Sequence, residues 1–347
     1  MINRSLGKLS YMAQWALARF SPRAAILAYH RVAELPSDPQ LLAVTPEKFE
    51  RHLQIIRQHF TILSLDQLCK GLEGGEIPAR AVAVTFDDGY ADNLYSAKPL
   101  LERYEVPATI FVTTGYIGKE REFWWDELQG LLLHPGTLPR ELRLRIRGKI
   151  FEWDLGEAAQ YPEETWEKHR HWNLLQKSIP GCRQHTYKRL HRLLRPLAGS
   201  ERDQILAELW DWRGEQPNGR QTNRILSKDE LTRLAAGGLV SIGSHTVNHP
   251  LLSSVVRAEG IKEILESKAT LEQILEHPVT GFSYPFGSWT TYTKQTVDII
   301  RDSGYEWACA AFPGAVAKKT NRWQLPRFLV RNWDGEEFRE RLDRWLS

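Results

Sequence analysis

Short apolar runs alternate with amphipathic segments in the first third of the chain and again in the last third. The apolar runs end at turn-forming residues and are rich in β-branched side chains, which predicts buried strands. These predicted strands cover residues 24–29, 61–63, 81–86, 108–112, 239–242, 281–284, 307–311 and 328–330. Strands that alternate with helices in this way indicate an α/β protein built on a parallel sheet or barrel.

Helix-start signals agree with this order of elements. Thr45 precedes a proline, and Ser64 and Ser227 each have a Gln or Glu three residues later, as in a capping box. We therefore expect helices to begin after these three residues. Apolar positions spaced three to four apart predict further helices over 93–104, 255–276, 292–302 and 336–346.

The alternation stops between residues 119 and 226. Helical patches rich in Trp, Arg and His fill this stretch, which predicts a mainly helical insertion within a domain spanning 24–347. Residues 1–23 are basic and partly apolar, and predict an amphipathic segment that packs on the domain or lies on a membrane surface. They have no long apolar stretch, so we expect neither a signal peptide nor a membrane span. This favours a cytoplasmic protein, with peripheral membrane contact as an addition.

Composition and charge narrow the class of protein. The chain has 347 residues, of which 42% are hydrophobic and 26% charged, enough for a large core. Its three cysteines lie far apart without a CxxC pattern, which suits a reducing compartment and argues against a thiolate zinc site. A net charge of +3 is too small to indicate a nucleic-acid partner. The basic stretch 168–200 contains no acidic residue and could meet an anionic polymer or lipid, although a solvated helix face is the commoner explanation.

Candidate chemistry begins where the predicted strand 81–86 ends. Asp87 and Asp88 follow it directly, with Gly89 and Tyr90 behind them. Neighbouring carboxylates repel each other unless a cation or hydrogen bonds separate their roles. The alternative is a simple Asp-Asp-Gly turn, since these residues are common turn formers.

Two later stretches also follow predicted strands. His245 and His249 are four residues apart, within the range of metal-site spacings, and two imidazoles with one carboxylate can form a facial triad. The stretch 284–287 could hold backbone amides toward a reacting oxygen or simply make a turn. The carboxyl ends of parallel strands gather on one face of a barrel, so we expect all three stretches to meet there.

These residues resemble the motifs of the polysaccharide deacetylase family, also known as the NodB-homology family or the fourth carbohydrate-esterase family. Residues 85–89 look like its first motif, 244–250 like its second, and 284–287 like a degenerate third. The opening 29–32 resembles members from exopolysaccharide biosynthesis. The resemblance covers about residues 24–118 and 227–335. It implies a distorted (β/α) barrel of the NodB type and metal-dependent removal of acetyl groups, usually from N-acetylglucosamine units.

The resemblance also implies roles for individual residues. Asp87 would be the general base, and the Phe286 N–H would join an oxyanion hole. The expected metal ligands are Asp88, His245 and His249, and the expected neighbours of the oxyanion or substrate are Tyr90, Pro285, Phe286 and Gly287. A bound divalent metal would polarise the acetyl carbonyl and acidify water. Zinc is the expected ion, and cobalt or nickel would also fit.

The sequence departs from the family pattern at two points. Ser283 stands where the family usually has an arginine that orients the base, so Arg327 or Arg331 is expected to supply that charge. No histidine follows His277, although the family's last motif often supplies a histidine acid. His30, at the end of the first predicted strand, is the candidate for that role, with a packing role as the alternative.

Three other functions stay open on the sequence alone. A catalytically silent carbohydrate-binding barrel would explain the missing arginine and late histidine, but would not need a base beside a metal triad. An O-acetyl esterase is chemically close to an N-deacetylase. A non-haem iron oxygenase shares the triad and little else. We expect a carbohydrate with N-acetyl groups as substrate, in a polymer or in a glycolipid or oligosaccharide precursor, and make no prediction of oligomeric state.

Overall fold

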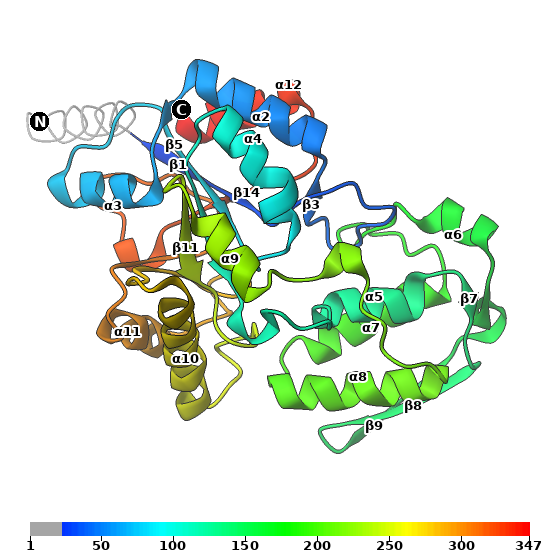
Figure 1. Ribbon diagram of the computed structural model, residues 1–347. Helices are drawn as coiled ribbons and strands as arrows, with labels where there is room; N and C mark the ends of the chain where they lie inside the picture. Colours follow the sequence, from blue (N-terminus) through cyan, green and yellow to red (C-terminus); the bar gives the residue numbers. More distant parts are fainter. Residues whose placement is uncertain (1–22) are drawn as a thin grey trace, which may run out of the picture.

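A curved parallel sheet forms the centre of the computed structural model, which describes residues 23–347 (Figure 1). The strand order is β13-β12-β11-β6-β5-β1-β14. The short strand β4 pairs with the first two residues of β5, and β6 pairs with the later residues of β5. The strands are β1 (Ala24–Tyr29), β4 (Thr61–Ile62), β5 (Ala81–Phe86), β6 (Ala108–Val112), β11 (Val240–Ser244), β12 (Gly281–Ser283), β13 (Trp307–Cys309) and β14 (Phe328–Leu329). The amphipathic segment predicted over 1–23 lies outside the described residues, apart from residue 23.

The central strands are buried on both faces. Every residue of β1, β5 and β6 is buried, which explains why these strands read as continuous apolar runs instead of alternating ones. Tyr29 pairs with Phe86 at the carboxyl ends of β1 and β5. That register places the residues that follow the two strands side by side.

The segment before β14 bridges the two edge strands of the sheet. The Leu325 amide donates to the Ala308 carbonyl at 2.9 Å, and the Ala310 amide donates back to the Leu325 carbonyl at 2.9 Å. Backbone hydrogen bonds therefore continue from β13 toward β14 although the two strands do not pair directly. The result is a distorted (β/α) barrel, as the sequence predicts.

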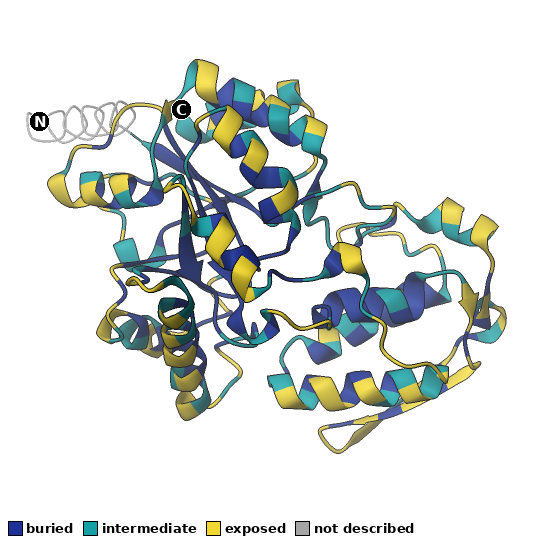
Figure 2. Cartoon of the chain, viewed as in Figure 1, coloured by how far each residue is buried: buried dark blue, intermediate teal, exposed yellow. Residues whose placement is uncertain are grey.

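Helices cover the outside of the barrel, with exposed residues facing away from the buried strands (Figure 2). They are α2 (Pro46–His59), α3 (Leu65–Gly74), α4 (Lys98–Arg103), α9 (Lys228–Ala235), α10 (Arg257–Leu275), α11 (Lys294–Asp302) and α12 (Gly335–Leu346). The three predicted start signals hold, because the side chains of Thr45, Ser64 and Ser227 each accept a backbone N–H of the first helical turn. The helix predicted over 93–104 begins as a π-helical turn, Asn93–Ala97.

Residues 119–226 fold beside the barrel around a second hydrophobic cluster (Figure 1). Their helices are α5 (Trp124–Leu133), α6 (Glu163–His169), α7 (Cys182–Leu194) and α8 (Gly199–Arg213). The segment also contains a hairpin of β8 (Glu141–Ile146) and β9 (Lys149–Asp154), and a short ladder of β7 (Gly136–Thr137) with β10 (Gln160–Tyr161), which the sequence analysis did not predict. In β8, polar and apolar residues alternate, so one face packs and the other is exposed. A further short ladder joins β2 (Arg31–Val32) to β3 (Ala43–Val44) at the mouth of the barrel.

In the basic stretch 168–200, Lys168, Lys177 and Arg192 are exposed, whereas two arginines contact other parts of the protein. Arg183 is buried and donates hydrogen bonds to five backbone carbonyls of the insertion, those of Leu132, His134, Gly136, Ala158 and Ala159. The Arg195 guanidinium lies 4.3 Å from the centre of the Phe286 ring. Within residues 23–347, each helix is too short or too polar to cross a bilayer.

Candidate active site and metal centre

The three suspected stretches meet at the carboxyl end of the sheet. Asp87 and Asp88 follow β5, His245 and His249 follow β11, and residues 284–287 follow β12. The sequence prediction that strand ends would bring them together is therefore confirmed. Four non-glycine residues here have left-handed backbones, namely Asp88 (φ 77°), Thr246 (φ 68°), His249 (φ 51°) and Phe286 (φ 60°). Such concentrated strain is typical of functional sites.

Asp88, His245 and His249 form a compact, buried cluster of potential metal ligands. The Asp88 Oδ1 atom lies 3.7 Å from His245 Nε2 and 3.5 Å from His249 Nε2. Two ligands bonded to one zinc ion at about 2.0–2.2 Å are about 3–3.5 Å apart, so the cluster is close to the required size. Among the described residues, Asp88 Oδ1 has no hydrogen-bond partner although it is buried. The donor set and this orphaned oxygen fit a divalent cation.

The protonation of the cluster agrees with a metal site. Burial, together with the neighbouring Asp87 charge, raises the pKa of Asp88 well above its usual value, and the charges of Arg31 and Arg327 offset this rise only in part. Burial lowers the pKa of both His245 and His249, which favours neutral imidazoles. The His245 Nδ1 lies 2.8 Å from the Ser283 carbonyl, and this contact assigns the proton to Nδ1 and leaves Nε2 as a lone-pair donor.

Asp87 is held in a different way, by Arg327. The Arg327 Nη1 and Nη2 atoms donate to Asp87 Oδ1 and Oδ2 at 2.8 and 2.6 Å, a two-pronged ion pair inside the barrel. The remaining donors of Arg327 reach the Ala310 carbonyl, Thr85 Oγ1 and Ser283 Oγ. Burial alone would raise the pKa of Asp87, but the Arg327 charge outweighs it and holds the pKa well below the usual range.

This geometry separates the two arginines that the sequence analysis left as alternatives. Arg331 donates to the carbonyls of Gln40 and Leu41 and makes no hydrogen bond to Asp87. Arg327 contacts Ser283, so its guanidinium lies beside the position where the family usually has an arginine. The same charge thus reaches Asp87 from the segment that precedes β14 (Phe328–Leu329).

His30 is adjacent to Asp87 in the sheet register. It follows Tyr29, whose carbonyl accepts the Asp87 N–H at 3.0 Å. Burial lowers the pKa of His30 to about 4, and the Asp87 charge opposes this only in part. The imidazole is therefore neutral at pH 7. Its predicted role as a general acid stays a prediction and requires that it first gain a proton during the reaction.

The third stretch turns back over the metal cluster. The Phe286 ring packs edge-on against the His249 ring, with centroids 4.7 Å apart, and Pro285 is buried behind it. Gly287 has φ 57°, and a Cβ there would lie 2.4 Å from the Ala311 amide nitrogen, so only glycine fits. The left-handed pair Phe286–Gly287 thus fixes the turn in which the predicted oxyanion donor lies.

Tyr90 has a structural environment that the sequence analysis did not anticipate. It is fully buried, and its hydroxyl donates to Asp126 Oδ2 at 2.7 Å and accepts from Trp125 Nε1 at 2.9 Å. Both of these partners belong to the insertion, and the predicted contact of Tyr90 with the oxyanion or substrate stays a prediction. Burial raises the pKa of Asp126 to about 7.

The insertion supplies a wall of the metal cluster that sequence reasoning missed. The Trp125 ring packs against His249 at 5.0 Å between centroids, and Phe123 does so at 6.2 Å. The Phe123–Asp126 run was visible only as part of an aromatic-rich stretch, without a strand before it. Its position gave no signal that it would reach the site.

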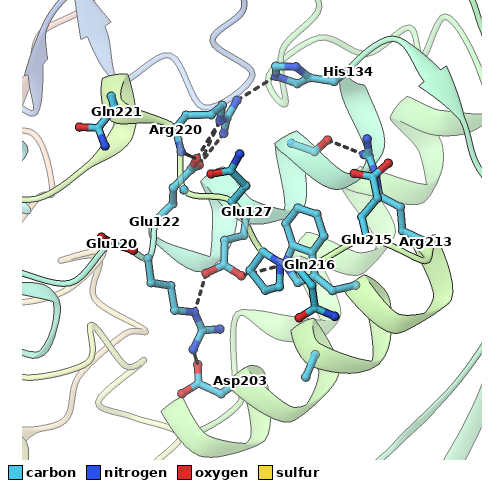
Figure 3. Close-up of a pocket in the computed structure, with 17 residues that line it drawn as sticks. Glu120, Glu122, Glu127, His134, Asp203, Arg213, Glu215, Gln216, Arg220 and Gln221 are labelled. Carbon is cyan, nitrogen blue, oxygen red and sulfur yellow. Dashed lines mark hydrogen bonds and ion pairs between the residues drawn. The ribbon is translucent and has the colours of Figure 1, made fainter.

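A cavity of about 720 Å³ lies within the insertion (Figure 3). Its charged residues largely pair with one another. Arg220 binds Glu122 at 2.6 Å, and Arg121 joins Glu127 to Asp203 at 2.5 and 2.8 Å. None of its lining residues belongs to the Asp-His-His cluster.

Comparison with known proteins identifies the family. A family model described as polysaccharide deacetylase matches residues 74–138 and 182–308, together more than half of the chain. The chain belongs to the polysaccharide deacetylase family. The match includes both metal-ligand stretches and extends into residues 119–138 and 182–226, which the sequence analysis placed outside the resemblance. It includes neither His30 nor Arg327.

Individual relatives agree with this assignment. The Bacillus subtilis (strain 168) protein YxkH, named for the same family, is 28% identical over 318 residues, which cover 91% of this chain and 74% of that protein. A poly-beta-1,6-N-acetyl-D-glucosamine N-deacetylase of Staphylococcus epidermidis is 33% identical over 131 residues. That alignment covers 33% of this chain and 42% of the staphylococcal protein.

Solved structures show the same fold. The Streptococcus pyogenes deacetylase PplD in complex with acetate has a TM-score of 0.56 at 18% identity, with 94% of this chain and 99% of PplD covered. IcaB from Ammonifex degensii has a TM-score of 0.55 at 16% identity, with coverages of 94% and 98%. The predicted NodB-type barrel, the family and the assignment to the deacetylases, a class of hydrolases, are confirmed.

Proposed function

We propose that this deacetylase removes acetyl groups from N-acetylated sugar residues, in a polysaccharide or in its glycolipid or oligosaccharide precursor, with the help of a divalent metal. The observation that carries the proposal is the pair of adjacent carboxylates with opposite environments. Asp87 is ionised and held by Arg327, whereas Asp88 turns toward two imidazoles an oxygen that has no hydrogen-bond partner among the described residues. One carboxylate is thus prepared for proton transfer and the other for a cation.

The residues divide the chemistry between them. Asp88, His245 and His249 would hold the metal, which when bound would polarise the acetyl carbonyl and acidify a nearby water. Asp87, oriented by Arg327, would accept the proton of the attacking water. The turn at Phe286 would direct its N–H toward the oxygen that gains negative charge. His30 would first take over the proton that Asp87 accepts and then pass it to the departing amine.

The substrate class follows from the relatives. The Staphylococcus epidermidis relative is named for a polymer of N-acetylglucosamine, which supports N-acetylglucosamine units as the substrate here. The histidine-rich ligand set favours zinc, with cobalt or nickel as substitutes. The expected cytoplasmic location, with contact to a membrane surface, stays a prediction.

Acetate release from N-acetylglucosamine oligomers tests this proposal. We expect no release by metal-stripped protein, recovery on adding zinc or cobalt, and loss of the recovered activity in Asp87→Asn. Metal-independent release, or release from O-acetylated sugars alone, would contradict it. Tight metal binding without release of any acetyl group would instead indicate a silent binding protein.

A further inference from the structure

The metal-binding loop 245–249 has a backbone that needs support. Thr246 and His249 both have positive φ angles, 68° and 51°. A β-branched residue such as threonine rarely adopts this conformation. Strained residues persist only where the surrounding structure fixes them, so the groups that hold this loop also determine where the His249 imidazole points.

A barrel helix holds the N–H groups of the loop. Glu263 of α10 accepts the amides of Val247 and Asn248, each at 2.8 Å, and also the Asn248 side-chain amide at 2.8 Å. The His249 amide donates to Thr246 Oγ1 at 3.1 Å. One buried carboxylate therefore fixes the middle of the loop from the barrel side.

The carbonyl groups of the loop are shared between the barrel and the insertion. Gly115, which precedes the insertion, donates its amide to the Val247 carbonyl at 2.8 Å. The last two carbonyls are served by Arg202 of α8, whose Nη2 reaches the Asn248 oxygen at 2.7 Å and whose Nη1 reaches the His249 oxygen at 3.3 Å. Arg202 thus acts on the peptide groups next to the His249 imidazole.

Arg202 is placed for this contact rather than for an ion pair. Its side chain is buried, and within the described part of the chain no carboxylate lies within 4.0 Å of its guanidinium. Gly199, at the start of α8, allows the close approach, because a Cβ there would lie 3.2 Å from Asn248 Cβ. Arg202 donates hydrogen bonds to two carbonyls of the loop, so its removal would leave these two buried carbonyls without a partner.

We propose that Arg202 is a positioning residue for the metal ligand His249, and that it works with Glu263 as a two-sided clamp on the loop. The clamp joins the insertion to the barrel, so metal affinity depends on a helix outside the barrel. This inference rests on the proposed metal site. It does not depend on which acetylated substrate the enzyme uses.

Cobalt binding to the metal-free protein tests the clamp without substrate. The variants are Arg202→Met, which removes both donors, and Arg202→Lys, which keeps the charge. Arg183→Met is the matched control, because Arg183 is also a buried insertion arginine that serves carbonyls, none of them in the metal loop. Cobalt affinity is measured by competition with a chelator, coordination by the visible spectrum of bound cobalt, and folding by thermal melting of the metal-free protein.

We expect Arg202→Met to weaken cobalt binding about 10–100-fold and to alter the cobalt spectrum. Arg202→Lys should restore part of the affinity. Arg183→Met should lower the melting temperature but change cobalt affinity by no more than about twofold, because it lies in a separate network. If Arg202→Met does not fold, Glu263→Gln tests the other side of the clamp and should also weaken cobalt binding.

Equal cobalt affinities and spectra in Arg202→Met and Arg183→Met would reduce Arg202 to a structural residue and overturn the inference. In the event that Arg202→Met does not fold, wild-type cobalt affinity in Glu263→Gln would do the same. Wild-type protein that binds no cobalt would refute the metal site itself. Cobalt affinity that falls in the clamp variants, in a protein whose wild type releases no acetate, would support this inference and refute the proposed deacetylation.

Discussion

Two charged regions of the molecule, the metal cluster at the barrel mouth and the cavity in the insertion, use buried carboxylates in opposite ways. In the cavity, Glu122 and Glu127 each have an arginine within ion-pair distance, at 2.6 and 2.5 Å. In the cluster, Asp88 faces two imidazoles whose pKa values are lowered by burial, and its Oδ1 has no hydrogen bond within residues 23–347. A buried carboxylate that is paired with an arginine already has its charge compensated. An unpaired buried carboxylate instead indicates a binding site for a cation.

The same contrast occurs within one dipeptide. Asp87 is paired with Arg327, and its pKa is held below the usual range, while burial raises the pKa of Asp88. The two residues are neighbours in sequence, so only their partners distinguish them. Both carboxylates are buried, so it is the presence or absence of an arginine partner that separates the role of Asp87 from that of Asp88.

Removing the unpaired carboxylate should have the largest effect on activity. Asp88→Asn is expected to abolish metal binding and to lower kcat/KM by about 10³-fold or more, since metal catalysis supplies several kcal/mol of transition-state stabilisation. The metal-free protein should be at least as stable as wild type, because the substitution removes a buried carboxylate without a cation. Metal titration, steady-state kinetics and calorimetry of the metal-free protein check the three expectations. A large loss of metal-free stability would break the comparison.

Replacing Arg327, the partner of Asp87, should have the second-largest effect on activity. Arg327→Met is expected to lower kcat/KM by about 10²–10³-fold, because the base loses its orientation. Arg327 holds the pKa of Asp87 down, so without it burial should raise this pKa, and Asp87 would be protonated at a higher pH. The acidic limb of the pH–rate profile should therefore move to higher pH. An unmoved limb would show that Arg327 does not control the base.

His30 should have a smaller effect on turnover. His30→Ala is expected to lower kcat about 10²-fold with KM little changed, if the imidazole returns a proton to the leaving amine. Because burial lowers the pKa of His30 to about 4, the wild-type profile should lack a limb near the usual histidine value. Steady-state kinetics across pH check this. Unchanged turnover and pH profile in His30→Ala would leave His30 as a packing residue.

Breaking an ion pair of the cavity should affect stability instead of chemistry. Glu122→Gln leaves Arg220 without its carboxylate and is expected to destabilise the protein by about 3 kcal/mol. Cobalt affinity and kcat/KM of the folded fraction should stay close to wild type. Denaturant unfolding beside metal titration measures both. A loss of metal affinity without a loss of stability would place this pair in the active site.

The barrel and the central chemistry could be predicted from the order of residues alone. Strands β1 and β5 read as apolar runs because both faces are buried, and the residues after β5 and β11 could be recognised because parallel strands end on one face. Capping residues fixed the helix starts because their hydrogen bonds are local. Interactions of this kind involve residues that are close in sequence, so they can be predicted from the sequence directly.

The arginine that pairs with Asp87 and the contacts that the insertion makes with the metal loop could be identified only in the folded protein. Both Arg327 and Arg331 flank the last predicted strand, so the sequence did not distinguish them. In the structure Arg327 precedes β14 and reaches Asp87 through the barrel interior. Arg202 and Glu263 act through backbone groups of a loop that is distant in sequence, and such contacts require no side-chain motif in the loop. Interactions between distant segments depend on how the chain closes on itself, and no local pattern encodes that.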